Sequence, residues 1–291
     1  MFKQLTLFED SVESSPNQKA ARSGTFVDNM SLPIHRWFRY SAGFAAPWVE
    51  EVLADWQIKP DQIVLDPFVG SGTVSIVCDA IGIDSIGVEA HPVVARICKA
   101  KLLWNCQPGQ LERFAAGMIE HARCCVDNAP SYPSLIQRSF DQEALMTLDR
   151  LKSAWTAMQD SSPESELAWL ALTSILRRAS KAGTAQWQYI LPNKTKKKVA
   201  HPMLAFGQQI ELMKQDMQWM QTRAEHSRAK TIMGDARAIG TSVQAQVDAV
   251  ITSPPYANNY DYAAPVRFEM TFWRDVNGWG DIHDAVRKHL I

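Results

Sequence analysis

The stretch DQIVLDPFVGSGTVSIVCDAIGIDSIGVE, residues 61–89, decides the fold of this chain. Its apolar run IVL predicts a short buried strand, and a glycine-rich turn over residues 66–73 connects that strand to a predicted helix over 74–81. A second short strand follows over 85–88 and ends at Glu89. A strand, a helix and a second strand in this order form a βαβ unit, which predicts a parallel sheet covered by helices.

The chain then changes to helical sequence before strand-like sequence returns. Apolar residues recur every three or four positions in four segments, which predicts helices over 111–127, 142–160, 164–182 and 203–230. Strand-like sequence returns in KTIMGDARAI and VDAVITSPPY, residues 230–239 and 247–256. We therefore predict an α/β fold in which a parallel sheet of about four strands is interrupted by a largely helical insertion.

These patterns divide the chain into three parts. Residues 1–24 are polar and rich in Ser, Asn and Gln, which predicts a flexible leader. Residues 25–108 and 230–291 are predicted to form one discontinuous domain around the sheet, and residues 109–229 form the helical insertion. Within the insertion lies QWQYILPNKTKKKVAHP, residues 186–202, which predicts a basic loop bounded by prolines. Its lysines, together with Arg177 and Arg178, are candidates for contacts to phosphates, and a solvated charge run is the alternative.

The composition is that of a globular protein, with 46% hydrophobic residues, 21% charged residues and a formal charge of −1. No apolar run approaches the ~20 residues of a membrane span, and the chain does not open with a signal peptide. The five cysteines form no CxxC pair, which argues against a disulfide framework or a zinc knuckle. We therefore expect a cytoplasmic protein without a membrane partner or a metal site.

The turn DPFVGSGT, residues 66–73, has the composition of a ligand-binding turn between a strand and a helix. Gly70 and Gly72 permit positive φ and let a ligand approach the bare backbone, while the next helix offers its N-terminal N–H groups. The Gly-Lys-Ser/Thr of a phosphate-binding loop is missing, and Ser75 replaces the third glycine of the dinucleotide fingerprint. A plain tight turn is the alternative interpretation.

Three acidic residues follow the predicted strands. Asp66 ends the first strand, Glu89 ends the second, and Asp235 follows the third. Ligands of open α/β sheets bind beyond the carboxyl ends of the strands. There Glu89 is placed to accept both hydroxyl hydrogens of a ribose, and Asp235 to accept from an adenine amino group. Because nothing in this outline cradles a phosphate, it favours S-adenosylmethionine over NAD or ATP.

The fourth predicted strand runs into Ser253-Pro254-Pro255-Tyr256 at the same end of the sheet. One interpretation is a rigid turn, and the other is a site that activates the exocyclic amine of a nucleobase. The Ser253 hydroxyl and the Pro254 carbonyl are candidates to accept the two amine hydrogens, and consecutive prolines fix φ and so aim that carbonyl. Tyr256 offers a flat face for an extruded base, a contact that contributes ~1–3 kcal/mol.

DPFVGSGT and TSPPY together resemble the signature motifs of the amino-group DNA methyltransferases, which methylate cytosine N4 or adenine N6 with S-adenosylmethionine. The resemblance covers roughly residues 31–100 and 230–270 and implies a Rossmann-like methyltransferase sheet. It implies that the glycine turn and the two later acids bind the cofactor, namely Asp66, Pro67, Phe68, Gly70, Ser71, Gly72, Thr73, Glu89 and Asp235. It implies catalytic roles for Ser253, Pro254, Pro255 and Tyr256.

The resemblance also implies a site-specific enzyme of a restriction-modification or defence system, acting on double-stranded DNA with a flipped target base. In this family, serine at the first catalytic position is more typical of cytosine N4 than of adenine N6 enzymes. Methylation at cytosine C5 is excluded because it needs a thiolate, usually from a Pro-Cys pair, and the chain contains no Pro-Cys. An RNA base amino-methyltransferase is one alternative, although such enzymes usually have Asp or Asn in place of Ser253.

A second alternative is a non-catalytic subunit. The residues after Tyr256 predict helix and loop rather than the further strands of the family's sheet. We therefore expect this chain to be the N-terminal part of a split or truncated enzyme, completed by a second polypeptide.

Overall fold

The computed structural model describes residues 28–40, 43–125, 131–185, 189–225, 227–255 and 261–288. The predicted leader over residues 1–24 and the predicted catalytic Tyr256 lie outside these residues. The chain divides into two compact units. The first unit combines the described residues up to Asn105 with those from Gln218 to Tyr262, and the second combines Cys106–Met217 with Ala263–Lys288.

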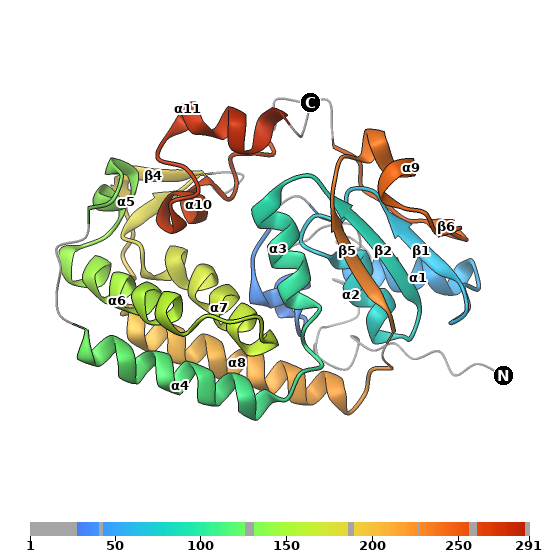
Figure 1. The fold of residues 1–291 in the computed structure, drawn as a ribbon, viewed down its shortest axis with the longest axis horizontal. Coiled ribbons are helices and arrows are strands. Elements are labelled where there is room, and N and C mark those ends of the chain that lie inside the picture. The colour runs from blue at the N-terminus through green and yellow to red at the C-terminus, as the bar shows by residue number, and fades with distance from the viewer. Residues whose placement is uncertain are drawn as a thin grey trace. The chain divides into compact units, whose positions relative to one another are not determined.

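The first unit contains a four-stranded parallel sheet, which confirms the predicted α/β fold (Figure 1). Its strands are β1 (Ile63–Asp66), β2 (Asp84–Glu89), β5 (Ala229–Met233) and β6 (Ala249–Val250), in the order β5-β2-β1-β6. β2 pairs with one side of β1 and β6 pairs with the other. The chain runs from β1 through β2 to β5 on one side and then crosses to β6 on the other side of β1. The carboxyl ends of β1 and β6 therefore meet at the switch point where such sheets bind ligands.

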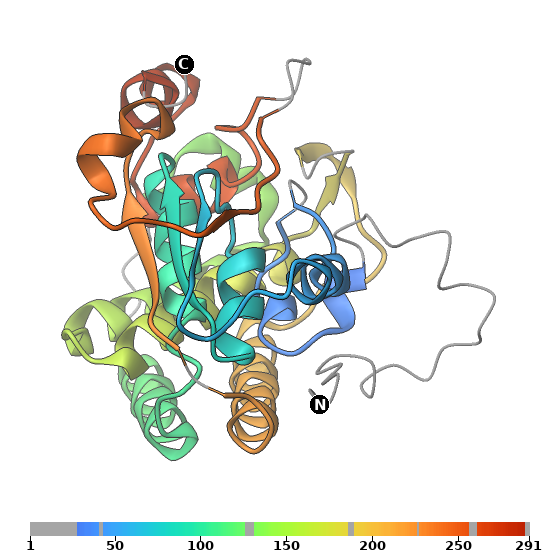
Figure 2. The same ribbon diagram turned by 90° about the vertical axis from the view of Figure 1, so that its right-hand side faces the viewer.

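Three helices of the first unit are α1 (Ala46–Asp55), α2 (Thr73–Ala80) and α3 (Pro92–Lys101). α2 is buried along its whole length, and α1 packs against it (Figures 1 and 2). α3 packs against β2 and β5. This unit also contains the short helices η2 (Asp28–Ser31), η3 (His35–Trp37), η5 (Ala236–Ala238) and α9 (Ile239–Ser242).

Gly72 lets the chain pass from the glycine turn directly into α2. Its φ is +95°, a left-handed conformation that glycine adopts without strain. A Cβ at this position would lie 2.8 Å from the Cys98 Sγ of α3. The turn therefore requires a glycine for its backbone conformation and for the close approach of α3.

The second unit is mainly helical, as its sequence predicts. Its helices include α4 (Pro108–Cys124), α5 (Ser134–Ser139), α6 (Gln142–Met158) and α7 (Pro163–Ala179), and α8 (Pro202–Gln221) begins in it. α4 packs against α6 and α7, which also pack against each other. α8 ends at Gln221 rather than near residue 230, because the chain from Ala229 pairs with β2. Within the described residues, no helix is long and apolar enough to cross a membrane.

The basic stretch that the sequence predicts as a loop contains a strand. β3 (Ala182–Thr184) pairs with β4 (Ile190–Thr195) in an antiparallel hairpin, so the loop prediction is wrong for β4. Pro192 lies within β4, and a strand in a two-stranded sheet tolerates proline where the missing N–H is not needed for the ladder. The proline and the lysines hide this strand from a pattern based on alternating apolar residues.

The segment Ala263–Lys288 clusters with the second unit, whereas the sequence analysis assigns residues 230–291 to the sheet domain. It contains α10 (Arg267–Trp273), α11 (Trp279–Ile282) and the π-helix η6 (His283–Arg287). Arg177 of α7 donates to the two carboxylate oxygens of the buried Glu269, at 2.6 and 3.0 Å. The ring of Phe268 stacks on that of Phe140 with 5.6 Å between centroids. These partners lie far apart in the chain, so no local pattern identifies them.

Candidate functional site

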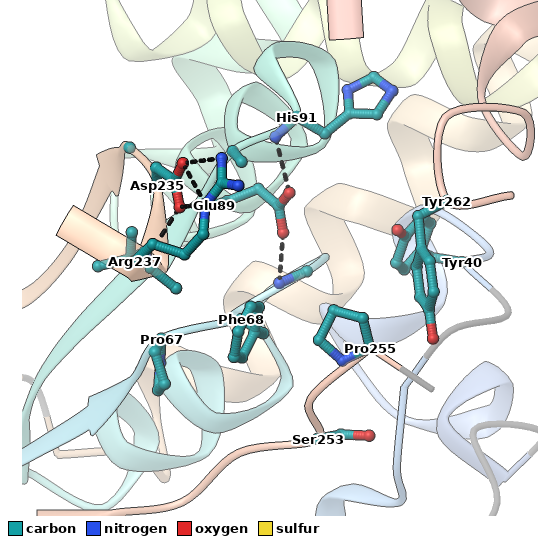
Figure 3. A pocket seen from close by; sticks show the side chains of 15 residues that line it. Tyr40, Pro67, Phe68, Glu89, His91, Asp235, Arg237, Ser253, Pro255 and Tyr262 are labelled. Atoms are coloured by element: carbon teal, nitrogen blue, oxygen red, sulfur yellow. Dashed lines mark hydrogen bonds and ion pairs between the residues drawn. The ribbon is translucent and has the colours of Figure 1, made fainter. Parts of the chain in front are cut away.

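A cavity of about 280 Å³ lies at the carboxyl ends of the strands of the first unit (Figure 3). The described residues that line it are Tyr40, Pro67, Phe68, Gly70, Val88, Glu89, Ala90, His91, Gly234, Asp235, Ala236, Arg237, Ser253, Pro255 and Tyr262. The lining includes seven of the residues that the sequence analysis selects: Pro67, Phe68, Gly70, Glu89, Asp235, Ser253 and Pro255. Asp66, Ser71, Gly72, Thr73 and Pro254 are not among the residues that line it.

Glu89 joins the glycine turn to the start of α3. Its carboxylate accepts hydrogen bonds from the backbone N–H groups of Gly70 at 3.0 Å and His91 at 2.8 Å (Figure 3). Burial raises the pKa of Glu89 to about 7, against the opposing effect of these N–H donors. A carboxylate offers about four acceptor positions, so Glu89 retains capacity for hydroxyl donors from a ligand.

Asp66 connects β1 to the chain that leads to Ser253. One of its oxygens accepts from the Thr252 hydroxyl at 2.7 Å and from the Phe68 N–H at 3.0 Å. Burial raises the pKa of Asp66 to about 7, because the carboxyl is almost completely removed from solvent. In this structure Asp66 therefore positions the glycine turn and the residue before Ser253, and its side chain does not line the cavity.

Asp235 forms a close ion pair with Arg237 at the cavity wall (Figure 3). Arg237 donates to its carboxylate from Nη2 at 2.5 Å, from Nε at 2.9 and 3.0 Å, and from the backbone N–H at 2.8 Å. Arg237 is the only Lys or Arg among the described residues that line the cavity. The carboxylate that the sequence analysis assigns to an adenine amino group is thus already bonded to a guanidinium.

Ser253 and Pro255 reach the cavity because the chain stays on β1 beyond the end of β6. The Ile251 N–H donates to the Leu65 carbonyl at 3.0 Å, which continues the pairing toward Ser253. Ser253 and Pro255 consequently line the same cavity as Phe68 and Gly70. Figure 3 shows Ser253, Pro255 and Phe68 in this lining. The glycine turn and the Ser-Pro-Pro segment, far apart in the sequence, meet at one cavity.

Several lining residues were not selected from the sequence: Tyr40, Val88, Ala90, His91, Gly234, Ala236, Arg237 and Tyr262. A usable signal existed for Arg237, which follows Asp235 by two residues just beyond a strand. Tyr40 and Tyr262 belong to the sequence stretches HRWFRYSAGF and NNYDY, which resemble segments of the amino-group methyltransferases, the first of them a segment that closes over the cofactor. The fold brings these two tyrosines to the cavity. Among the described residues, no three His, Cys, Asp or Glu side chains gather to hold a metal ion.

Comparison of the chain with known proteins shows which family its sequence resembles. Residues 12–100, which include the glycine turn and Glu89, match the family model described as DNA methylase, N6_N4_Mtase. Over these residues the chain resembles the amino-group DNA methyltransferases. The resemblance predicted from DPFVGSGT and TSPPY is thereby confirmed at the level of the family.

Two Type II methyltransferases are similar to this chain. M.BsoBI of Geobacillus stearothermophilus is 27% identical over 275 residues, which cover 85% of this chain and 54% of that protein. M.AvaI of Nostoc sp. is 32% identical over 77 residues, which cover 26% of this chain and 16% of that protein. The chain thus spans about half the length of M.BsoBI. No solved structure matches the chain.

The cofactor of these amino-group methyltransferases is S-adenosylmethionine, and the cavity has a donor and acceptor set that fits its nucleoside. Both Glu89 and Asp235 line the cavity. The Glu89 carboxylate can accept from hydroxyl groups, and the Asp235 carboxylate can accept from an amine. The bare backbone of Gly70 forms part of the wall. Among the described residues that line the cavity, Arg237 is the single Lys or Arg, and it is bonded to Asp235.

Proposed function

We propose that this chain carries the cofactor and catalytic motifs of a site-specific DNA methyltransferase that methylates an exocyclic amine, with cytosine N4 as the preferred target. The observation that carries the proposal is the shared cavity, in which Ser253 and Pro255 lie with Gly70, Glu89 and Asp235. A methyl donor held by the second group of residues would face an amine held by the first. That juxtaposition is the geometric requirement of direct methyl transfer.

The chemistry requires the amine to become a better nucleophile. When bound, S-adenosylmethionine supplies an electrophilic methyl group. The Ser253 hydroxyl and the Pro254 carbonyl accept the two N–H groups of the base amine, which localises the nitrogen lone pair. Acceptors placed in advance stabilise the positive charge that develops on nitrogen. The amine then loses one proton to solvent, so the site needs no strong base.

The preference for cytosine N4 rests on Ser253. Serine at this position resembles the cytosine N4 enzymes of the family, and adenine N6 is the alternative. A role in a restriction-modification system is supported by the Type II methyltransferases to which the chain is similar. The proposed substrate is double-stranded DNA with the target base turned out of the helix, since a base within the stack cannot reach such a cavity.

A second polypeptide that completes the sheet is part of the proposal. β6 is the last strand on its side of the sheet among the described residues, and Val250 within it is 48% exposed. A strand at the edge of a sheet presents unpaired N–H and C=O groups that can pair with another chain. Without that completion the chain would act as a non-catalytic, cofactor-binding subunit.

The test is methyl transfer from labelled S-adenosylmethionine to duplex DNA, with and without the product of the adjacent reading frame. Mass spectrometry of the digested DNA identifies N4-methylcytosine or N6-methyladenine. Ser253→Ala is expected to lower the rate on the order of 100-fold by removing an acceptor in the transition state. Ser153→Ala, on an exposed face of α6, serves as the matched control. An unchanged rate in Ser253→Ala, or methylation of RNA alone, would overturn the proposal.

A further inference from the structure

Exposed cations gather around the β3–β4 hairpin of the second unit. Lys194 lies in β4, and Lys197 and Lys198 follow that strand. Arg138 of α5 donates to the Asn193 side chain of β4, and Arg178 lies at the end of α7, where its carbonyl accepts from the Ala200 N–H at 3.0 Å. The five exposed side chains that we call the hairpin surface are Arg138, Arg178, Lys194, Lys197 and Lys198.

The fold holds this hairpin in a defined place. The Ser180 hydroxyl donates to the Ser139 carbonyl at 2.9 Å, and the Lys181 N–H donates to the same carbonyl at 2.9 Å. Both serines are buried. At Gly183 a Cβ would lie 2.9 Å from the Lys194 Cβ, so the glycine is needed for the two strands to approach. The lysines are therefore presented from an anchored hairpin that packs against α5 (Figure 1).

The charge on this part of the chain is one-sided. Residues 177–201 contain seven Lys and Arg and no Asp or Glu. Two of the seven are neutralised by carboxylates elsewhere, since Arg177 pairs with Glu269 and Lys181 pairs with Asp141. Within the described part of the chain, Lys194, Lys197 and Lys198 form no ion pair.

Like charges are also brought close together beneath this surface. The Lys196 ammonium donates to the carbonyl of Arg177 at 2.6 Å. Burial and the neighbouring Arg177 guanidinium lower the pKa of Lys196. A concentration of positive charges destabilises the fold because the charges repel one another. A bound polyanion reduces this repulsion.

We propose that the hairpin surface binds the phosphate backbone of duplex DNA, as a contact separate from the cavity that holds the target base. The inference rests on the proposed function for the identity of the polyanion. The lysines contact phosphates as point charges and carry no sequence information themselves. Their role is to contribute affinity and to set the register of the duplex on the second unit.

The experiment measures binding of a short fluorescein-labelled duplex to the whole chain by anisotropy, at salt concentrations from about 50 to 200 mM. The test variant is K194Q/K197Q/K198Q. Each lost phosphate contact lowers the slope of log K against log salt by about 0.9, so the slope is expected to become shallower by about 2–3. The variant K194R/K197R/K198R keeps the charge and is expected to keep the slope.

The matched control is K59Q/K99Q/K214Q, which removes the same charge from α8 and from two exposed sites of the first unit. It is expected to retain the wild-type slope. Equal slopes for the wild type and K194Q/K197Q/K198Q would overturn the inference, and so would absence of duplex binding by the wild type. Preferential displacement of the duplex by an RNA hairpin would replace DNA with RNA as the partner. Adenosine binding by the wild type is measured in parallel. Its absence would count against the proposed function and not against the hairpin surface.

Discussion

At the scale of single residues, Glu89 gives the cavity a carboxyl group whose protonation changes near neutral pH. Its pKa of about 7 means that the free protein holds a mixture of protonated and ionised forms at neutral pH. Ribose hydroxyls donate to the ionised form and therefore favour it. We expect the affinity for adenosine, which does not itself titrate in this range, to rise as the pH increases through about 7, by up to about tenfold per pH unit below that value.

Calorimetry between pH 6 and 8 checks this expectation for Glu89, with Glu89→Gln expected to lose the dependence. Asp66→Asn is the matched control, because Asp66 also has a pKa of about 7 and its side chain does not line the cavity. This variant should keep a pH dependence, with its midpoint moved to lower pH because the Asp66 charge helps to raise the pKa of Glu89. If the pH dependence disappeared in Asp66→Asn and persisted in Glu89→Gln, it would arise from Asp66 and the expectation for Glu89 would be wrong.

Arg237 competes with a ligand amine for the carboxylate of Asp235. The pair is exposed to solvent, so its own contribution to stability is small. Arg237→Met is expected to strengthen adenosine binding about twofold to fivefold. In the variant, the Asp235 carboxylate does not have to give up its guanidinium partner before it accepts from the adenine amine. Arg228→Met removes an ion pair of another exposed arginine, with Asp84, and should leave binding unchanged. Weaker binding in Arg237→Met would instead mean that the guanidinium orients Asp235 for the ligand.

At the scale of elements, Lys101 ties the end of α3 to η3. Its ammonium is completely buried and donates to the carbonyls of His35 at 3.1 Å and Phe38 at 3.4 Å. Tyr40, two residues beyond Phe38, lines the cavity. Burial of the Lys101 charge is unfavourable, and its hydrogen bonds to these two carbonyls near the cavity offset part of that free energy.

Burial lowers the pKa of Lys101 to about 7, which gives its contribution to stability a definite sign. Between pH 7 and 10.5 the unfolded chain binds a proton that the folded chain lacks, so stability rises with pH in this window and is level below it. Relative to Lys101→Met, the wild type is expected to gain about 2 kcal/mol between pH 7 and 9. Urea unfolding at both pH values measures this, and a constant difference would contradict it.

At the scale of the whole molecule, we expect the two compact units to unfold at different urea concentrations. The buried Glu269 pairs with Arg177 inside the second unit, and removing one partner of such a pair leaves a buried charge uncompensated. Glu269→Gln is expected to destabilise the second unit on the order of 3 kcal/mol. Adenosine binding by the first unit should survive at urea concentrations that unfold the second.

Tryptophan fluorescence and adenosine binding, followed through the same urea series, check the separation. Glu211→Gln is the control, since it removes an exposed pair with Lys214 and should not shift the unfolding midpoint. Coincident loss of both signals in Glu269→Gln would show that the units unfold as one.

The parts of this protein that could be predicted from its sequence are those set by neighbours along the chain. The strand, glycine turn, helix and second strand of residues 61–89 follow from local apolar runs and from glycine's access to positive φ. The helices of the second unit follow from spacings of three and four residues. The strand β4 was missed because its lysines and Pro192 lack the alternation that identifies a half-buried strand.

The sequence by itself determined the α/β fold, the glycine turn and the resemblance to the amino-group DNA methyltransferases, because these depend on short-range pattern and on motifs read in order. Only the tertiary structure decided that Asp66 faces Thr252, that Asp235 is bonded to Arg237 and that Ala263–Lys288 cluster with the helical unit. The direction of a side chain and the pKa of a carboxyl depend on burial and on partners from other segments. Those partners exist only once the chain has folded.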